Sequence, residues 1–288
     1  TIIIPGTVKE IGVNAFSNNK TLEKVIIEDG VEKIRACAFM ECRNLEEIEL
    51  PDSINYIGAQ AFYYCANLKM ITIPPKVENI FGHTFAGNYN LSRVILNEGL
   101  NQVFFGNLNL RNITIKEGAN FIYENEMLMS KNKEDLLFIS NNYLENITTF
   151  TIPEGVKKFN TSISLYENIK KIVIPETLEE FTKGTSSTIL PTTIEEIEVS
   201  EKNSKFSVSN KDKILYTKDT KELIMCFSKE ENINIDPNNE IGILKLNSWS
   251  FSQASNAKVI TLPDSLITIN RQVFDFNKKL QELRIGKN

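Results

Sequence analysis

The sequence predicts an α/β repeat solenoid, in which short strands form a parallel sheet on the concave side and arcs with 3₁₀ turns form the convex side. Three observations predict this fold. A spacing of 23 residues recurs along the chain, each repeat contains alternating apolar residues followed by proline, and two segments that break the spacing resemble each other. Because a unit of 23 residues cannot bury its apolar face alone, stacked units are expected to share one continuous core.

The spacing is clearest in the first hundred residues, where four apolar positions recur every 23 residues over four units. These positions are Leu22, Leu45, Leu68 and Leu91; Phe16, Phe39, Phe62 and Phe85; Val8, Val31, Ile54 and Val77; and Ile11, Ile34, Ile57 and Ile80. The same step returns near the C-terminus, from Phe251 to Phe274. Four positions that keep one period predict one structural unit per 23 residues.

One repeat shows how each element is predicted in chain order. Ile48 and Leu50 alternate with polar residues, which is typical of a strand with one buried face. Pro51 ends the strand, because proline has no N–H to donate to a ladder. The spacing of three between Ile54 and Ile57 predicts a tight helical turn or 3₁₀ arc. Phe62 then brings a large side chain back toward the strand.

Two middle repeats depart from the pattern. The step from Leu91 to Leu110 is only 19 residues, and its arc is reduced to the segment 103–106, Val-Phe-Phe-Gly. A later repeat has a polar run, 182–188, where its arc is expected. We expect both repeats to pack less well than the regular ones and to change the curvature.

Two segments interrupt the repeats, and both are predicted to be β-hairpins. Residues 127–132 align with residues 214–219, and each pair of apolar runs surrounds a polar turn. The offset of 87 residues between Leu128 and Leu215 indicates a duplicated block. We therefore predict a single right-handed solenoid over 1–288, with about eleven coils. Its predicted parts are repeats 1–119, hairpin insertion 120–140, repeats 141–200, hairpin insertion 201–228 and repeats 229–288.

The repeat resembles the BspA-like, or Treponema pallidum-type, subclass of leucine-rich repeats. The residues that carry the resemblance in one unit are Leu45, Ile48, Leu50, Pro51, Ile54, Ile57, Ala61, Phe62, Cys65 and Asn67. Like that subclass, the chain lacks the asparagine ladder that follows the strand in commoner leucine-rich repeats. The resemblance implies a non-catalytic extracellular or cell-surface module for recognition or adhesion, and it implies that hairpin insertions interrupt the repeats.

Residues that could carry catalysis are few. His83 is the only histidine, so catalytic triads and most zinc sites lack their residues. By register, His83 occupies the position of Asn14 and Cys37, which favours a structural role. Glu46, Glu47 and Glu49 could suggest a glycosidase pair, but neighbouring glutamates on one exposed strand face are expected in a chain with 37 acidic residues. We predict no catalytic, cofactor or metal site.

Two of the four cysteines, Cys42 and Cys65, occupy the same repeat position. Adjacent strands lie about 4.8 Å apart, which leaves a disulfide open as an alternative. The resemblance implies instead that cysteine serves here as a small buried side chain. Cys37 and Cys226 lie in other contexts and do not have the spacing of a zinc site.

The composition limits the classes of partner. A net charge of −5 does not favour nucleic acid, and the longest strictly apolar run, about six residues, is too short to span a bilayer. No signal peptide is visible, and both ends fall inside a repeat, so we expect a piece of a longer or processed protein. We expect this segment to be monomeric.

The outward strand positions form the candidate binding surface. In the N-terminal repeats they are Lys24, Ile26, Glu47, Glu49, Met70, Thr72, Arg93 and Ile95. We expect this concave surface to recognise a protein or a glycan. The alternatives are a structural spacer, or a regulatory repeat region of a larger surface protein or hydrolase.

Overall fold

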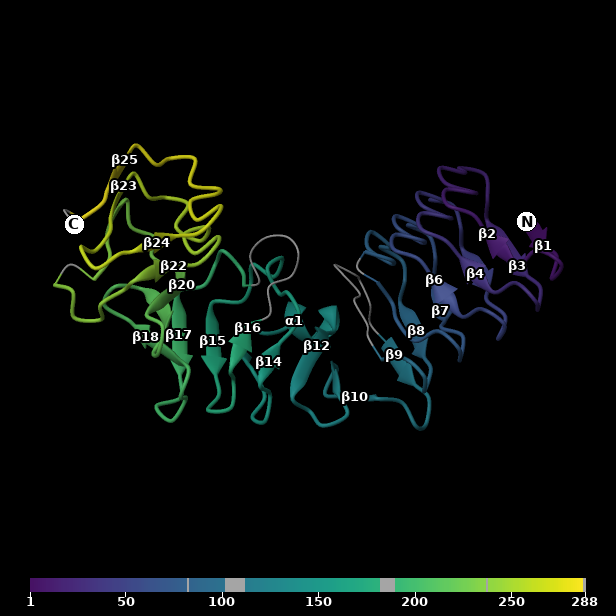
Figure 1. The fold of residues 1–288 in the computed structure, drawn as a ribbon, viewed down its shortest axis with the longest axis horizontal. Helices are drawn as coiled ribbons and strands as arrows, with labels where there is room; N and C mark the ends of the chain where they lie inside the picture. Colours follow the sequence, from purple (N-terminus) through teal and green to yellow (C-terminus); the bar gives the residue numbers. More distant parts are fainter. Residues whose placement is uncertain (82, 102–111, 182–189, 237, 287–288) are drawn as a thin grey trace. The chain divides into compact units, whose positions relative to one another are not determined.

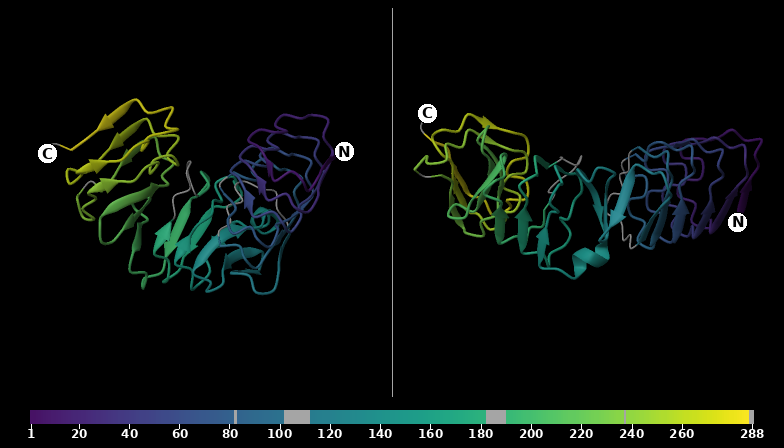
Figure 2. Two further views of the ribbon diagram at one scale, coloured as in Figure 1. Left: turned by 45° about the vertical axis from the view of Figure 1, so that its right-hand side comes forward. Right: turned by 90° about the horizontal axis from the view of Figure 1, so that it is seen from below.

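The computed structural model describes residues 1–81, 83–101, 112–181, 190–236 and 238–286. The chain forms two compact units, Thr1–Tyr143 and Leu144–Asn288 (Figure 1). Both units are built from short strands that follow one another in successive coils. Figure 2 shows this stacking within each unit from two further directions. The arrangement is the parallel β-solenoid that the 23-residue spacing predicts.

The first strand of each coil in unit 1 belongs to a parallel sheet. One sheet contains β1 (Ile2–Ile4), β3 (Lys24–Ile27) and β5 (Glu47–Glu49), and the other contains β7 (Met70–Thr72), β8 (Arg93–Leu96) and β9 (Asn112–Ile115). The register joins residues one repeat apart, so that Ile26 pairs with Ile3 and with Glu49. The repeat spacing therefore sets the register of the sheet.

The apolar pair at spacing three does not form the expected 3₁₀ turn. A hydrogen bond from the Ile54 N–H to the Pro51 carbonyl closes a turn, and the chain then enters a second short strand. These second strands, β2 (Glu10–Ile11), β4 (Lys33–Ile34) and β6 (Tyr56–Ile57), pair in parallel. The described residues contain no 3₁₀ helix. The expectation was wrong because the backbone partners lie in the next coil, which local spacing does not reveal.

The arc that follows is also bonded from coil to coil. The N–H groups of Cys37, Phe39 and Glu41 donate to carbonyls of residues 59, 61 and 63 in the next coil. This pattern requires a left-handed backbone at the first arc position, with φ between 57° and 63° at Asn14, Cys37, Gln60 and His83. His83 is therefore a residue of the arc, in agreement with the predicted structural role.

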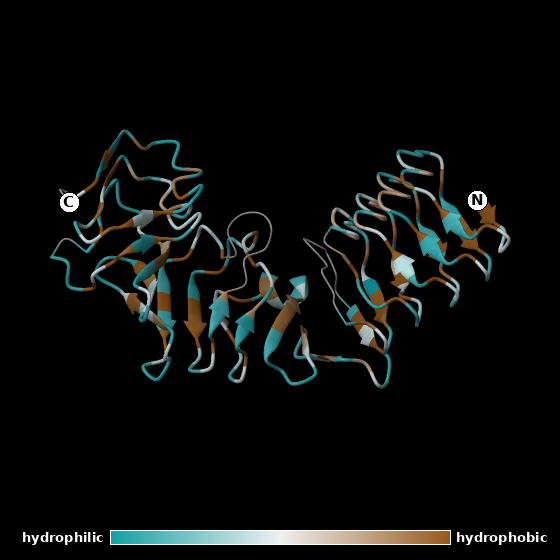
Figure 3. Ribbon diagram, viewed as in Figure 1, coloured by the Kyte–Doolittle hydropathy of each residue, from teal (hydrophilic) through white to brown (hydrophobic). Residues whose placement is uncertain are grey.

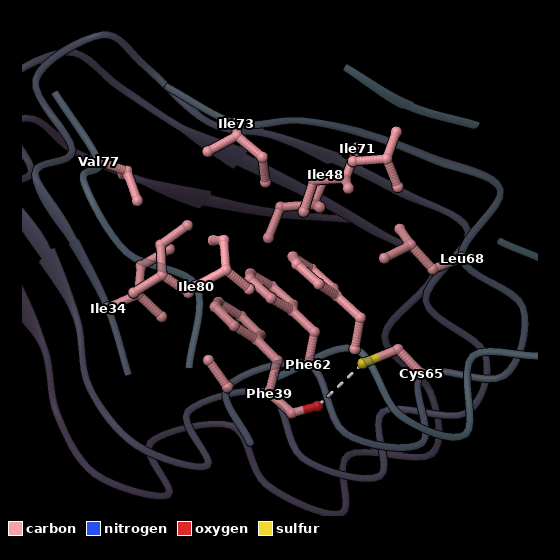
Figure 4. Close-up of a cluster of buried hydrophobic side chains, with 14 of the residues drawn as sticks. Ile34, Phe39, Ile48, Phe62, Cys65, Leu68, Ile71, Ile73, Val77 and Ile80 are labelled. Atoms are coloured by element: carbon pink, nitrogen blue, oxygen red, sulfur yellow. Dashed lines mark hydrogen bonds between the residues drawn. The ribbon is translucent and has the colours of Figure 1, made fainter. Parts of the chain in front are cut away.

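The phenylalanines of successive arcs stack inside unit 1. The ring centroids of Phe16, Phe39, Phe62 and Phe85 lie 5.3, 5.5 and 5.7 Å apart, and neighbouring rings are within 7° of parallel. Figure 4 shows Phe39 and Phe62 beneath the isoleucines of the strands. Phe39, Phe62 and Phe85 are fully buried. Strand and arc thus enclose one apolar core, as the sequence predicts.

All four cysteines are free, so the disulfide alternative is wrong. Cys42 and Cys65 are buried, and their thiols donate to the carbonyls of Phe16 and Phe39, at 3.0 and 3.1 Å. The second of these hydrogen bonds is drawn in Figure 4. The buried role expected for these side chains is confirmed, and each also supplies a hydrogen bond to an arc carbonyl.

Both hairpin insertions are present, and each has three antiparallel strands. The first consists of β10 (Phe121–Glu124), β11 (Met127–Ser130) and β12 (Asp135–Ile139), and the second of β18 (Phe206–Ser209), β19 (Ile214–Thr217) and β20 (Glu222–Cys226). Each has a β-bulge, between Leu128 and Met129 in the first and between Leu215 and Tyr216 in the second. The bulges are 87 residues apart, as expected for a duplicated block.

Unit 2 has the same two kinds of strand. Its first strands form two sheets, β13 (Thr149–Thr151) with β15 (Lys171–Ile174) and β17 (Glu196–Val199), and β21 (Asn232–Asn234) with β23 (Val259–Thr261) and β25 (Glu282–Arg284). Its second strands are β14 (Lys158–Phe159), β16 (Glu180–Phe181), β22 (Lys245–Leu246) and β24 (Thr268–Ile269). One short helix, α1 (Asn141–Glu145), lies where the two units meet in the sequence.

The two irregular arcs, 103–106 and 182–188, lie outside the described residues. The predicted single domain over 1–288, with its internal boundaries, stays a prediction. The strands of both hairpins lie within the ranges predicted for them.

Candidate recognition surface

The outward strand positions of unit 1 lie on one side of its strands. We call them the outer strand face: Lys24, Ile26, Glu47, Glu49, Met70, Thr72, Arg93 and Ile95. None of the eight is buried, whereas the residues between them, such as Val25 and Val94, are fully buried. Figure 3 shows the resulting interleaving of polar and apolar residues along the strands. The alternation in the sequence therefore predicts the orientation of these side chains correctly.

One lysine forms ion pairs with two glutamates on this face. The Nζ of Lys24 lies 2.8 Å from Glu47 and 3.8 Å from Glu49. The hydrogen bond with Lys24 lowers the pKa of Glu47 and raises that of Lys24. A general acid in glycoside hydrolysis needs a raised carboxyl pKa, so this shift is opposite to the one that catalysis requires. The glutamates behave as a paired, solvated strand face.

Unit 2 repeats the same arrangement. The Nζ of Lys171 lies 2.7 Å from Glu196 and 2.9 Å from Glu198, and the hydrogen bonds raise the pKa of Lys171. In both units, the lysine of one strand faces the glutamates of the next strand in register. Lys24 and Lys171 are therefore both paired with glutamates of the same chain.

Arg93 is the exception on the outer strand face. No described residue forms an ion pair or hydrogen bond with its guanidinium. Met70, its partner in register, is 47% exposed, and Ile95 lies on the same side of the same strand. An arginine beside exposed apolar side chains can bind a carboxylate through two parallel hydrogen bonds while its neighbours bury apolar surface. Arginine is also enriched among the residues that dominate binding energies at protein interfaces.

The corresponding positions in unit 2 are more polar and their charges are paired. They are Thr149, Thr151, Lys171, Val173, Glu196, Glu198, Val259, Thr261, Glu282 and Arg284. Arg284, for example, lies 2.8 Å from Glu282 on its own strand. Unit 1 therefore presents exposed apolar surface beside a cation that has no ion-pair partner among the described residues.

Other candidate sites offer less chemistry. No group of three or more His, Cys, Asp and Glu side chains in the described ranges could hold a metal ion. None of the helices in the described part of the chain has the length and apolar character to cross a membrane. An apolar hollow of about 320 Å³ lies among Ile2, Ile4, Val8 and Phe16 at the first coil. Its lining is mostly apolar, and Glu10 is its single charged residue.

Comparisons with known proteins point to one family. A family model described as the BspA type leucine rich repeat region matches residues 9–133, 100–187, 134–209 and 182–288. No curated protein matches the sequence.

Two solved structures are similar in fold. A leucine-rich cell-surface protein from Faecalibacterium prausnitzii superposes with a TM-score of 0.61 at 20% identity, covering 99% of this chain and 79% of that one. The pneumococcal vaccine antigen PcpA has a TM-score of 0.57 at 24% identity, covering 100% of this chain and 62% of that one. The present chain thus spans less than two thirds of the PcpA chain.

Proposed function

Because this chain belongs to the BspA-type leucine-rich repeat family, we propose that it is a non-catalytic recognition module of the cell surface or extracellular space. It binds a protein partner through the outer strand face of unit 1. The observation that carries this proposal is Arg93, which has no partner among the described residues and lies beside exposed Met70 and half-buried Ile95.

The parallel strands suit such a role because they hold side chains at fixed intervals. Neighbouring strands are about 4.8 Å apart, so side chains from several coils form a regular array on a rigid frame. Residues that bind from a rigid sheet lose little conformational entropy when the partner arrives. A protein surface that fits Arg93 and its apolar neighbours would carry a carboxylate flanked by apolar side chains.

The proposed location is supported by the similar structures. The Faecalibacterium prausnitzii protein is described as a cell-surface protein, and PcpA as a pneumococcal vaccine antigen. A surface or secreted location for this chain would give the outer strand face access to partners outside the cell.

A structural spacer is the second candidate. The paired charges around Lys24 and Lys171 favour it, because a face that satisfies its own charges needs no ligand. A spacer would have no specific partner, and substitutions on either strand face would leave adhesion unchanged.

Binding measurements on the purified chain separate these candidates. We would immobilise fibronectin, laminin, type IV collagen and fibrinogen, and measure binding by biolayer interferometry. The proposal expects at least one protein to bind, and expects Arg93→Glu to weaken that binding by about tenfold or more. Lys76→Glu, the same charge reversal at an exposed position in the turn after β7, serves as the matched control. Absence of binding, or equal effects of both variants, would favour the spacer.

A further inference from the structure

Three tyrosines cluster on the arcs of unit 1. The rings of Tyr63 and Tyr64 lie 4.6 Å apart at 67°, and those of Tyr64 and Tyr89 lie 5.9 Å apart at 82°. Tyr63 and Tyr64 are half-buried, and Tyr89 is 56% exposed. We call these three residues the tyrosine cluster. They follow arc phenylalanines, on loops separate from the strands of the outer strand face.

A glycine in the next coil allows the cluster to form. Gly87 has a φ of 78°, and a Cβ atom placed on it would lie 2.6 Å from the Tyr64 ring. The ring of Tyr64 therefore lies directly against the backbone at Gly87. The ring of Tyr89 is almost perpendicular to the ring of Tyr64. We call this pair of rings the Tyr64–Tyr89 corner.

The solenoid does not need tyrosine at these positions. Residues equivalent to Tyr64 in the preceding coils are Asn18 and Glu41, which have the same left-handed backbone. Residues equivalent to Tyr89 are Lys20, Arg43 and Ala66. Since unrelated side chains fill the same positions elsewhere, packing of the arc does not explain the three aromatic rings.

Polar groups border the cluster. The Asn90 amide donates to the Asn67 side-chain oxygen at 3.2 Å, and the Arg43 guanidinium lies 2.9 Å from Glu41. A hydrogen bond with Tyr64 raises the pKa of Tyr89, so the Tyr89 hydroxyl stays protonated in neutral solution. The surface therefore combines apolar ring faces with hydroxyl, amide and guanidinium groups at their edges.

We propose that the tyrosine cluster is a carbohydrate-binding site, which stacks a pyranose ring of an oligosaccharide on the Tyr64–Tyr89 corner. A pyranose has an apolar face of C–H groups and a rim of hydroxyls, which matches apolar ring faces bordered by hydrogen-bonding groups. The amphipathic tyrosine ring suits a ligand of this kind.

The size of the cluster favours a sugar over a protein. A stable protein interface covers about 800 Å² on each partner. The three rings offer the area of one or two sugar units, and charged and amide side chains surround them. This site is independent of the outer strand face, so the glycan proposal does not rest on the function proposed for that face.

The test measures binding of defined saccharides to the purified chain. Chitotetraose, cellotetraose, mannotriose and sialyllactose would each be titrated to about 5 mM, with saturation-transfer NMR and calorimetry as readouts. We expect at least one of them to bind, with its signals arising from ring C–H protons. Tyr89→Ala should weaken that binding by about tenfold. Tyr89→Phe, which keeps the ring, should retain most of it.

Two control variants test whether saccharide binding is confined to the tyrosine cluster. Tyr56→Ala removes a half-buried tyrosine of the same unit outside the cluster, and should leave saccharide binding unchanged. Arg93→Glu should also leave it unchanged, because that residue belongs to the outer strand face. Circular dichroism would verify that Tyr89→Ala is folded. The proposal is overturned if no saccharide binds, if binding survives both Tyr64→Ala and Tyr89→Ala, or if these variants affect only a protein ligand.

Discussion

The arcs of unit 1 and the last arcs of unit 2 have the same backbone pattern but differ in how their side chains pack. In unit 1 the stacked phenylalanine rings are within 7° of parallel, whereas Phe251 and Phe274 are tilted by 37° at a similar separation of 5.3 Å. Beside Phe251 lie Ser250 and Ser252, which are buried and whose hydroxyls have no hydrogen-bond partner among the described residues. The period alone therefore does not ensure parallel stacking of the arc rings.

The same comparison applies to the residue that closes each arc. In unit 1, Cys42 and Cys65 each donate one thiol hydrogen bond to an arc carbonyl. In unit 2, the Asn277 amide donates to the carbonyls of Phe251 and Ala254, at 3.0 and 2.8 Å. Buried carbonyls need donors. Cysteine and asparagine each supply a donor at this position, but the repeat does not require one, because Ala254 occupies the same position in the coil of Phe251.

The largest expected effect distinguishes the two kinds of arc. Phe62→Ala should lower the free energy of unfolding by about 3–5 kcal/mol, because it removes a fully buried ring stacked on both sides. Phe274→Ala should cost about 1–2 kcal/mol, since that ring is half-buried and tilted against one neighbour. Denaturant titrations would measure both. A loss below about 1 kcal/mol for Phe62→Ala would contradict the stacked core.

The second effect compares the two donors. Asn277→Ala should cost about 2 kcal/mol, because two buried carbonyls lose their donor. Cys65→Ala should cost about 1 kcal/mol, because it removes one weaker hydrogen bond. The same titrations apply, and a greater loss for Cys65→Ala than for Asn277→Ala would show that packing volume, rather than hydrogen bonding, determines this position.

The third effect depends on pH. Burial raises the pKa of Cys226 to about 12 and also raises that of Cys65. The folded state therefore holds these protons more tightly than the unfolded state. The resulting stability is fully present below about pH 8 and is lost as pH rises, by about 1.5–2 kcal/mol per thiol at pH 10. The free energy of unfolding, measured from pH 8 to pH 10, should fall less steeply in Cys226→Ala than in the original chain. Equal slopes would contradict the assigned burial.

Thiol labelling provides an independent control for that result. Iodoacetamide at pH 8 should modify Cys37, which is half-buried, and spare the three buried cysteines. All four should react after unfolding without reductant, because none forms a disulfide. Mass spectrometry would count the adducts, and only two adducts in the unfolded chain would reveal a bridge.

The smallest effect concerns the outer strand face. The double variant Glu47→Gln, Glu49→Gln removes both carboxylates that pair with Lys24, yet all three side chains are exposed. Exposed ion pairs contribute little, so we expect the melting temperature to stay almost unchanged. A drop of several degrees would mean that these pairs hold the strands together.

The sequence was sufficient for the coil, the core and the hairpins because 23-residue repetition relates each residue to its neighbour in the next coil. It also predicts that Lys24 and Glu47 both point outward from their strands. It did not predict β2, β4 and β6, since a two-residue strand depends on a partner in another coil. The tyrosine cluster was missed for a similar reason. Tyr64 and Tyr89 are 25 residues apart, and Gly87, which has no side chain, leaves room for the Tyr64 ring.

The most direct test of the recognition proposal is a hydrogen-exchange footprint of the chain bound to its protein partner. If the partner binds the outer strand face of unit 1, backbone amides should exchange more slowly in β7 and β8, where Met70 and Arg93 lie. Amide exchange in β13 and β15 of unit 2 should be unchanged. Arg93→Glu should weaken the footprint at the same partner concentration. Protection confined to unit 2 or to the arcs, with β7 and β8 exchanging as in the free chain, would contradict the assignment of the recognition surface.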